Sequence, residues 1–254
     1  MPIPSDRLEK GVSEKYKTLE KVLAANVAAA KYYAGRLKET KKAMDYLTGR
    51  GLKSEIIRQF GLGYAPGDGG SLTDYLKKAG FGPGLVEKAG LAGRSRSGVL
   101  YDRFRDRIMF PIIDVRGRVI GFGGRMMGSG KGPKYLNSPE TPAFYKGSTL
   151  YGLNMAKKHI VNGELIVVEG YMDVISLHQH GIQNAVASLG TAFTQRQAEI
   201  LKRYSTNVIV AYDSDAAGQA ATQRGMEILE GMGCRVRILE LPEGKDPDEY
   251  IKLH

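Results

Sequence analysis

Residues 164–173 read ELIVVEGYMD, and this stretch decides the fold. Leu165 to Val168 form a short apolar run rich in branched side chains, which is typical of a strand buried on both faces. Glu169 follows the run directly, and Asp173 lies four residues further on, at the start of an expected helix. In open α/β sheets, ligands bind beyond the carboxyl ends of the strands. A carboxylate at this point therefore predicts a functional site.

Two more clusters of acids follow strand-like runs. Asp213 and Asp215 come directly after a second apolar run, and Asp246 and Asp248 lie shortly after a third. Converging carboxylates repel one another unless protons or cations neutralise them, and hard oxygen ligands select Mg²⁺ or Mn²⁺. The three clusters together predict metal-assisted phosphate chemistry.

The C-terminal part alternates between strand and helix patterns. We expect strands over 164–168, 184–188, 207–212 and 236–241, and helices over 171–180, 194–203, 216–230 and 247–253. This alternation indicates a parallel, doubly wound sheet. The predicted fold class is α/β, a Rossmann-like parallel sheet with flanking helices over 159–254.

The N-terminal part predicts a mixed α+β subdomain over 1–158. Helical patterns cover 8–47, 52–60, 72–79 and 83–89. Two apolar runs at 107–114 and 118–122 flank a short turn and predict a hairpin. Residues 123–142 are rich in Gly, Pro, Lys and Ser, and we expect a long loop there, of a length that is usually functional or disordered.

Charge is divided unevenly along the chain, whose net charge is +10 over 254 residues. Residues 1–93 hold 16 basic and 10 acidic side chains, residues 94–158 hold 13 and 4, and residues 159–254 hold 8 and 13. A basic part thus precedes an acidic one. That arrangement suits an enzyme that holds a nucleic-acid backbone with one part and acts on phosphoesters with metal ions in the other.

The remaining composition excludes several classes. The single cysteine, Cys234, rules out a disulfide framework and a cysteine-rich zinc site within this chain. No apolar stretch approaches the ~20 residues of a membrane span. The first residues lack the apolar core of a signal peptide, so we expect a cytoplasmic protein.

Several strings resemble known families. VEGYMD at 168–173, followed by YDSDAAG at 212–218, is similar to the TOPRIM domain that primases, type IA and type II topoisomerases and some nucleases share. RFRDRIMFPI at 103–112, GRVIGFGGR at 117–125 and PKYLNSPET at 133–141 resemble the RNA polymerase domain of bacterial replicative DNA primases. The likeness runs through nearly the whole chain.

This resemblance implies a nucleotidyltransferase (EC 2.7.7) that makes short RNA primers on single-stranded DNA from ribonucleoside triphosphates and handles an RNA–DNA primer duplex. Members of the family also carry a zinc-binding module and a helicase-interacting region. The chain is therefore expected to be a catalytic core fragment without zinc. It would meet the replicative helicase and single-strand-binding protein only through regions that it lacks.

The acids are expected to fill the catalytic site. Glu169, Asp213 and Asp215 are the expected catalytic carboxylates and, with Asp173, the ligands of two Mg²⁺ or Mn²⁺ ions, while Asp246 and Asp248 are supporting acids. Structural roles remain open for some of them. Asp173 could interact favourably with a helix dipole, and Asp215 could cap the following helix. Asp246 and Asp248 could be turn residues.

Basic and polar side chains of the first part are candidates for nucleotide or template contacts. They are Arg103, Arg105, Arg125, Lys134, Asn137 and Lys146. Arginine forks bind phosphate through two hydrogen bonds, and lysine acts as a point charge. Tyr135 could touch a base or sugar, whereas Lys131 is expected to be a solvated loop residue.

Two other functions stay open. A topoisomerase-like or nuclease protein would use the same acids to cut DNA, but strand passage needs a nucleophilic tyrosine in a separate domain, and none of the 14 tyrosines is identified as one. A non-catalytic nucleic-acid-binding module would keep the basic side chains without needing the acids.

Overall fold

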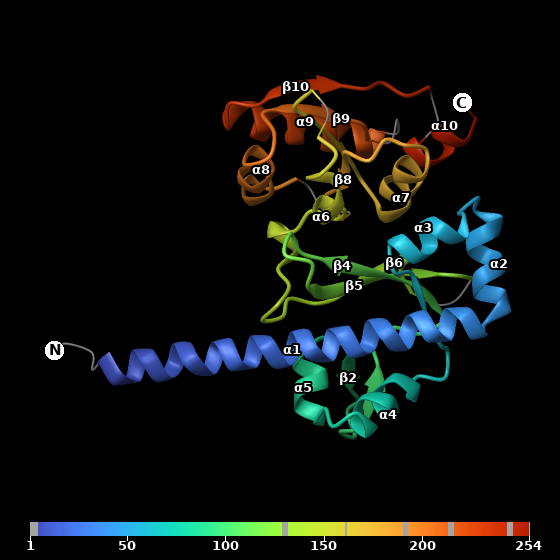
Figure 1. The fold of residues 1–254 in the computed structure, drawn as a ribbon, viewed down its shortest axis with the longest axis vertical. Helices are drawn as coiled ribbons and strands as arrows, with labels where there is room; N and C mark the ends of the chain where they lie inside the picture. The colour runs from blue at the N-terminus through green and yellow to red at the C-terminus, as the bar shows by residue number, and fades with distance from the viewer. Residues whose placement is uncertain are drawn as a thin grey trace. The chain divides into compact units, whose positions relative to one another are not determined.

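The computed structural model describes residues 5–128, 132–160, 162–189, 193–212, 216–242 and 246–253, without the side chains of 5–12 and 216–222. The chain packs into two compact units, each built from several segments of sequence (Figure 1). Unit 1 comprises Met1–Tyr46, Gly61–Ile112 and Arg118–Tyr145, and unit 2 comprises Leu47–Phe60, Ile113–Gly117 and Lys146–His254.

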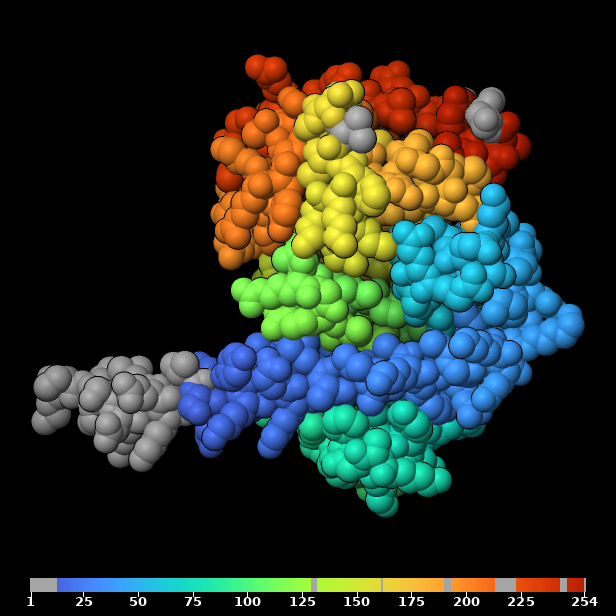
Figure 2. Space-filling view, in the orientation of Figure 1, coloured from blue at the N-terminus to red at the C-terminus, as the bar shows by residue number. Residues whose placement is uncertain are grey.

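Unit 1 is built on a long helix and an antiparallel sheet. Helix α1 spans Ser5–Glu39, and the sheet has the order β1-β4-β5-β6. Its strands are β1 Gly63–Ala65, β4 Arg107–Ile113, β5 Val119–Met126 and β6 Tyr135–Asn137. An added Cβ at Gly63 would lie 2.5 Å from Cβ of Tyr33 on α1, so only glycine lets the helix approach β1 this closely. Figure 2 shows one side of α1 on the surface.

A smaller group of elements lies in the same unit. It consists of α4 Ser71–Lys78, α5 Pro83–Lys88 and the antiparallel pair β2 Ala92–Arg94 and β3 Leu100–Asp102. The carboxylate of Asp102 accepts hydrogen bonds from the backbone N–H groups of Leu72 and Thr73, both at 2.9 Å. Burial nevertheless raises the pKa of Asp102. This buried acid therefore ties β3 to the first turn of α4.

Unit 2 contains the parallel sheet, with strand order β10-β9-β7-β8. Its strands are β7 Glu164–Val168, β8 Ala185–Ala187, β9 Asn207–Val210 and β10 Arg235–Ile238. The helices are α6 Leu153–Ala156, α7 Tyr171–Gln179, α8 Gln195–Lys202, α9 Ala216–Gly231 and α10 Pro247–Leu253, with the 3₁₀ turn η1 Lys146–Ser148. The parallel sheet with flanking helices confirms the predicted α/β fold class.

Unit 2 also includes α3 Ser54–Gln59, which follows α2 Lys41–Gly49. Phe60, at the end of α3, packs edge-on against His178 with ring centres 5.3 Å apart and lies 6.0 Å from the ring of Tyr151. The side chain of Gln179 accepts from the backbone N–H of Lys53 at 2.7 Å. It also donates to the carbonyl of Gly51 at 2.9 Å. The segment around α3 is thus fixed to α7.

Some local expectations are wrong. The helix expected over 8–47 is interrupted at Thr40, where α1 ends and α2 begins. The loop expected over 123–142 contains the end of β5 and all of β6, with Gly123 opposite Asn137. Backbone pairing makes these glycine-rich residues a strand, although their side chains show no alternation. Over the described residues, no helix is long and apolar enough to cross a membrane.

Candidate functional site

Glu169 lies at the carboxyl end of β7, beside the end of β9. Val167 lies opposite Val210 in the parallel register, and the N–H of Ala211 donates to the carbonyl of Val167 at 2.9 Å. Continuing this register places Glu169 next to Tyr212. The pKa of Tyr212 is raised to about 12, mainly by burial and also by the charge of Glu169, while the hydrogen bond with Ser188 opposes the shift. The charge of Glu169 therefore acts at the end of β9.

Asp213 and Asp215, together with Lys131, lie outside the described residues. Asp213 directly follows Tyr212 in the sequence. Within the described ranges, no group of three or more His, Cys, Asp or Glu side chains is arranged to hold a metal ion. The expected ligand set therefore stays a prediction.

Asp173 supports the turn that follows Glu169. Its side chain is buried, and Oδ2 accepts a hydrogen bond from the backbone N–H of Gly170 at 2.9 Å. A Cβ at Gly170 would lie 3.1 Å from the same oxygen, so this turn favours glycine. Asp173 thus caps α7 and holds the backbone next to Glu169 in place.

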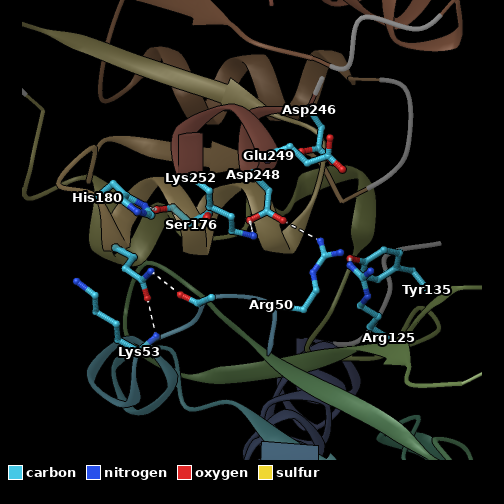
Figure 3. A network of polar contacts seen from close by, with 12 residues as sticks. Arg50, Lys53, Arg125, Tyr135, Ser176, His180, Asp246, Asp248, Glu249 and Lys252 are labelled. Atoms are coloured by element: carbon cyan, nitrogen blue, oxygen red, sulfur yellow. Dashed lines mark hydrogen bonds and ion pairs between the residues drawn. The ribbon is translucent and has the colours of Figure 1, made fainter. Parts of the chain in front are cut away.

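The two C-terminal acids are held in different ways. Oδ1 of Asp246 accepts a hydrogen bond from the backbone N–H of Glu249 at 2.7 Å, so Asp246 stabilises the first turn of α10. Asp248 is 1% exposed, with Oδ2 at 2.8 Å from Arg50 Nη2 and Oδ1 at 2.5 Å from Lys252 Nζ (Figure 3). Sequence reasoning missed Arg50, because it lies 198 positions from Asp248 and no local pattern links the two.

In unit 1, Arg125 on β5 is held by two aromatic rings. It is 9% exposed, and Nη1 donates to the hydroxyl of Tyr135 at 2.6 Å. Its guanidinium carbon lies 5.3 Å from the ring centre of Tyr135 and 5.9 Å from that of Tyr46. Burial lowers the pKa of Arg125, but these two tyrosines outweigh it and the net shift is upward. The arrangement keeps a charged guanidinium in a fixed orientation.

Arg107 is a second buried arginine, and sequence reasoning placed it only within a strand. Its Nη1 donates to the carbonyls of Gly124 and Pro133, both at 3.0 Å, and more weakly to that of Lys134 at 3.4 Å. Arg107 therefore fixes the backbone before β6, where the side chain of Lys134 is exposed. The one feature of the sequence that could have pointed to Arg107 is its position at the edge of an otherwise apolar run.

The other predicted contacts are spread over both units. Arg103 is half-buried, and Arg105 is exposed, with its guanidinium over the ring of Tyr101. Asn137 ends β6 in unit 1. Lys146 belongs to unit 2, where burial lowers its pKa.

Comparison with known proteins first defines the class of the part that contains the parallel sheet. Residues 166–251 match a family described as Toprim-like, and Toprim domains generally bind a divalent metal such as Mg²⁺. Residues 32–157 match the N-terminal domain of the DNA primase catalytic core. The chain belongs to the bacterial DNA primase family and corresponds to its catalytic core.

Individual relatives agree with this assignment. The chain is 48% identical over 247 residues to a DNA primase of Clostridium acetobutylicum, covering 97% of this chain and 41% of that protein. A DNA primase of Pseudomonas putida is 46% identical over 99% of this chain and 39% of its own length. The chain thus spans about two fifths of the length of these relatives.

Solved structures show the same architecture. The Aquifex aeolicus primase, comprising zinc-binding and RNA polymerase domains, superimposes with a TM-score of 0.87 at 40% identity, covering 93% of this chain and 58% of that one. A DnaG primase catalytic domain bound to single-stranded DNA gives a TM-score of 0.84 at 40% identity, covering 94% and 76%.

Proposed function

We propose that this chain carries the catalytic core of a primer-synthesising enzyme, which makes short RNA primers on single-stranded DNA by nucleotidyl transfer from ribonucleoside triphosphates. The observation that carries the proposal is the position of Glu169, at the end of β7 and beside the strand that leads into Asp213. Carboxylates from neighbouring strand ends can share one ligand.

The proposed metal ligands are Glu169, Asp213 and Asp215, with Asp173 in support. Their carboxylate oxygens are the hard donors that Mg²⁺ and Mn²⁺ prefer, so the donor set fits two such ions. Bound divalent ions supply positive charge that stabilises both the attacking and the leaving oxygens of a phosphoryl transfer. Asp173 contributes by capping α7, which keeps the backbone beside Glu169 in one conformation.

The basic residues would orient the polyanionic substrates. Arg125 presents a guanidinium held by Tyr135, so little side-chain entropy is lost when it binds a phosphate. Lys134 adds an exposed charge directly before β6, and Asn137, which ends β6, can hydrogen-bond a base or sugar. We assign the same kind of contact to Arg103, Arg105 and Lys146.

The two halves of the sequence would divide the work by charge. The basic part, 1–158, would hold template and nucleotides, and the acidic part, 159–254, would hold the metal ions. Asp246 and Asp248 would support the acidic part through α10 rather than through the metal. Regions present in the longer relatives would make the contacts with the replicative helicase and single-strand-binding protein. The enzyme would act at the replisome in the cytoplasm.

One incubation separates the competing functions. The chain is mixed with a single-stranded DNA template, labelled ribonucleotides and Mg²⁺ or Mn²⁺, with Glu169→Gln as the inactive control. New RNA that depends on template and metal supports the proposal. Cut DNA would indicate a nuclease, and binding without any product would indicate a binding module.

A further inference from the structure

The β2–β3 pair of unit 1 carries an arginine stacked on an exposed aromatic ring. Tyr101 on β3 is 38% exposed, and the guanidinium carbon of Arg105 lies 5.5 Å from the centre of its ring. Arg105 itself is exposed. A cation over an aromatic face at such a site is attracted by the ring quadrupole, so the ring restricts where the guanidinium sits.

Glycines fix both partners of this stack. Gly93 on β2 lies directly opposite Tyr101, and a Cβ at Gly93 would lie 2.6 Å from the ring carbon Cζ. The ring therefore covers the Gly93 backbone, and any other side chain would displace it. On the other partner, a Cβ at Gly69 would lie 3.3 Å from Cδ of Arg105, and Gly69 has a positive φ of +80°. The stem of Arg105 thus lies against the Gly69 backbone.

The acids around this stack are engaged elsewhere. Asp102 accepts from the first turn of α4, and Oδ1 of Asp106 accepts from the hydroxyl of Tyr64 at 2.9 Å. Glu87 pairs with Arg94 at 3.0 Å. Over the described part of the chain, Arg105 forms no ion pair. The guanidinium of Arg105 is therefore not neutralised by a carboxylate in direct contact with it.

Arg103 adds a second observation that points to an acceptor from outside the chain. Its guanidinium is half-buried, and burial lowers its pKa, although the nearby Tyr101 raises it. Its Nε is buried and has no hydrogen-bond acceptor among the residues that the structure describes. The buried Nε is out of reach of an incoming group, but the accessible part of this half-buried guanidinium can donate to an oxyanion.

We propose that Tyr101 is a positioning residue, which aims the guanidinium of Arg105 at a backbone phosphate of a single-stranded polynucleotide. The outer edge of the stacked guanidinium offers its donors to the phosphate, while Gly93 keeps the ring in place. This inference rests on the proposed function, because it assumes that a polyanionic template passes over unit 1.

The test measures binding of a labelled single-stranded oligonucleotide to the full chain in EDTA, by fluorescence anisotropy over a range of salt concentrations. Tyr101→Leu should weaken binding about two- to five-fold, the range that an exposed cation–π contact supports. Arg105→Met should reduce the slope of log affinity against log salt concentration by about 0.7, the value for one phosphate contact on a single strand. Tyr101→Phe keeps the ring face and should bind as the wild type does.

Two further variants separate positioning from folding. Gly93→Ala should reproduce the effect of Tyr101→Leu, because the added Cβ displaces the ring. In the Arg105→Met background, Tyr101→Leu should have no additional effect, since it acts only through Arg105. The same loss from Tyr16→Leu, an exposed tyrosine on α1, would show that the effect is nonspecific and overturn the inference.

The outcomes distinguish this inference from the proposed function. Unchanged binding in Tyr101→Leu, or fully additive losses with Arg105→Met, overturns the role of Tyr101 even if the wild type makes primers. A wild-type chain that binds the oligonucleotide but makes no RNA contradicts the proposed function and leaves the surface intact. A wild-type chain that does not bind overturns the inference itself.

Discussion

Nη2 of Arg50 lies 2.8 Å from Oδ2 of Asp248, a carboxylate 198 positions away that is 1% exposed. Lys252 approaches the other oxygen of the same carboxylate. Two cations thus surround one buried acid within unit 2 (Figure 3). A buried charge is tolerated only when it is paired, so this pairing keeps α10 attached to the segment before α3.

Replacing Arg50 by Met is expected to destabilise the chain. Removing one partner of a buried pair costs ~3–5 kcal/mol, and we expect about 2 kcal/mol here because Lys252 still compensates Asp248. Urea unfolding measures the change. Arg58→Met is the matched control, because its pair with Glu55 is exposed on both sides, and it should change stability by less than about 0.5 kcal/mol. Equal effects of the two substitutions would contradict this account.

Divalent ions are expected to bind among Glu169, Asp213 and Asp215. Crystals soaked in Mn²⁺ should show anomalous density within ~2.5 Å of these carboxylate oxygens. Glu169→Gln should remove that density and lower primer synthesis at least about a hundred-fold, whereas Glu199→Gln on α8 should change neither. Density found only elsewhere would contradict the assignment.

Template binding should not need the acids. Asp213→Asn combined with Asp215→Asn should abolish primer synthesis and leave the affinity for single-stranded DNA in EDTA unchanged, because the basic residues of 94–158 supply the attraction. Circular dichroism checks that the fold is retained. If a folded double variant lost template binding in EDTA, the acids would be organising the nucleic-acid surface instead of holding metal.

Lys134 is expected to contact a phosphate. Lys134→Ala should weaken binding of a single-stranded template and reduce the slope of log affinity against log salt concentration by about 0.7. Thermal stability should not change, because the side chain is exposed. Lys77→Ala on α4 removes the same charge from another exposed position and serves as the control. Identical behaviour of the two variants would show that only net charge matters.

Protonation of His178 should lower the stability of the fold as the pH falls. Burial lowers the pKa of His178 below its ordinary value of 6.5, although the hydrogen bond with the carbonyl of Ala185 opposes the shift. As the pH falls below about 6.5, the unfolded chain therefore binds a proton before the folded chain does, and stability is lost. In His178→Gln, the melting temperature should depend less on pH between about pH 7.5 and pH 5.5 than it does in the wild type. His180→Gln, at an exposed position, should keep the wild-type slope.

The strands of the parallel sheet were predictable because apolar runs of strand length alternate with helical patterns, and Glu169 was placed because it directly follows such a run. The contacts of Arg107 and Arg50 were not predictable. Arg107 reaches across β5 to the backbone before β6, and Arg50 meets an acid near the other end of the sequence. Such contacts depend on tertiary packing, which leaves no period or spacing in the sequence.

Unit 2 is discontinuous in sequence, and this has a consequence for how the chain folds during synthesis. Its first segment, Leu47–Phe60, leaves the ribosome long before α10, which supplies the partner of Arg50. Contacts between residues so distant in sequence form slowly, because a long loop must close first. Phe60 has no aromatic partner until Tyr151 and His178 have been made, and Arg50 has no acidic partner until α10 follows. The nascent chain therefore holds an early segment whose apolar and charged contacts are completed only by later residues.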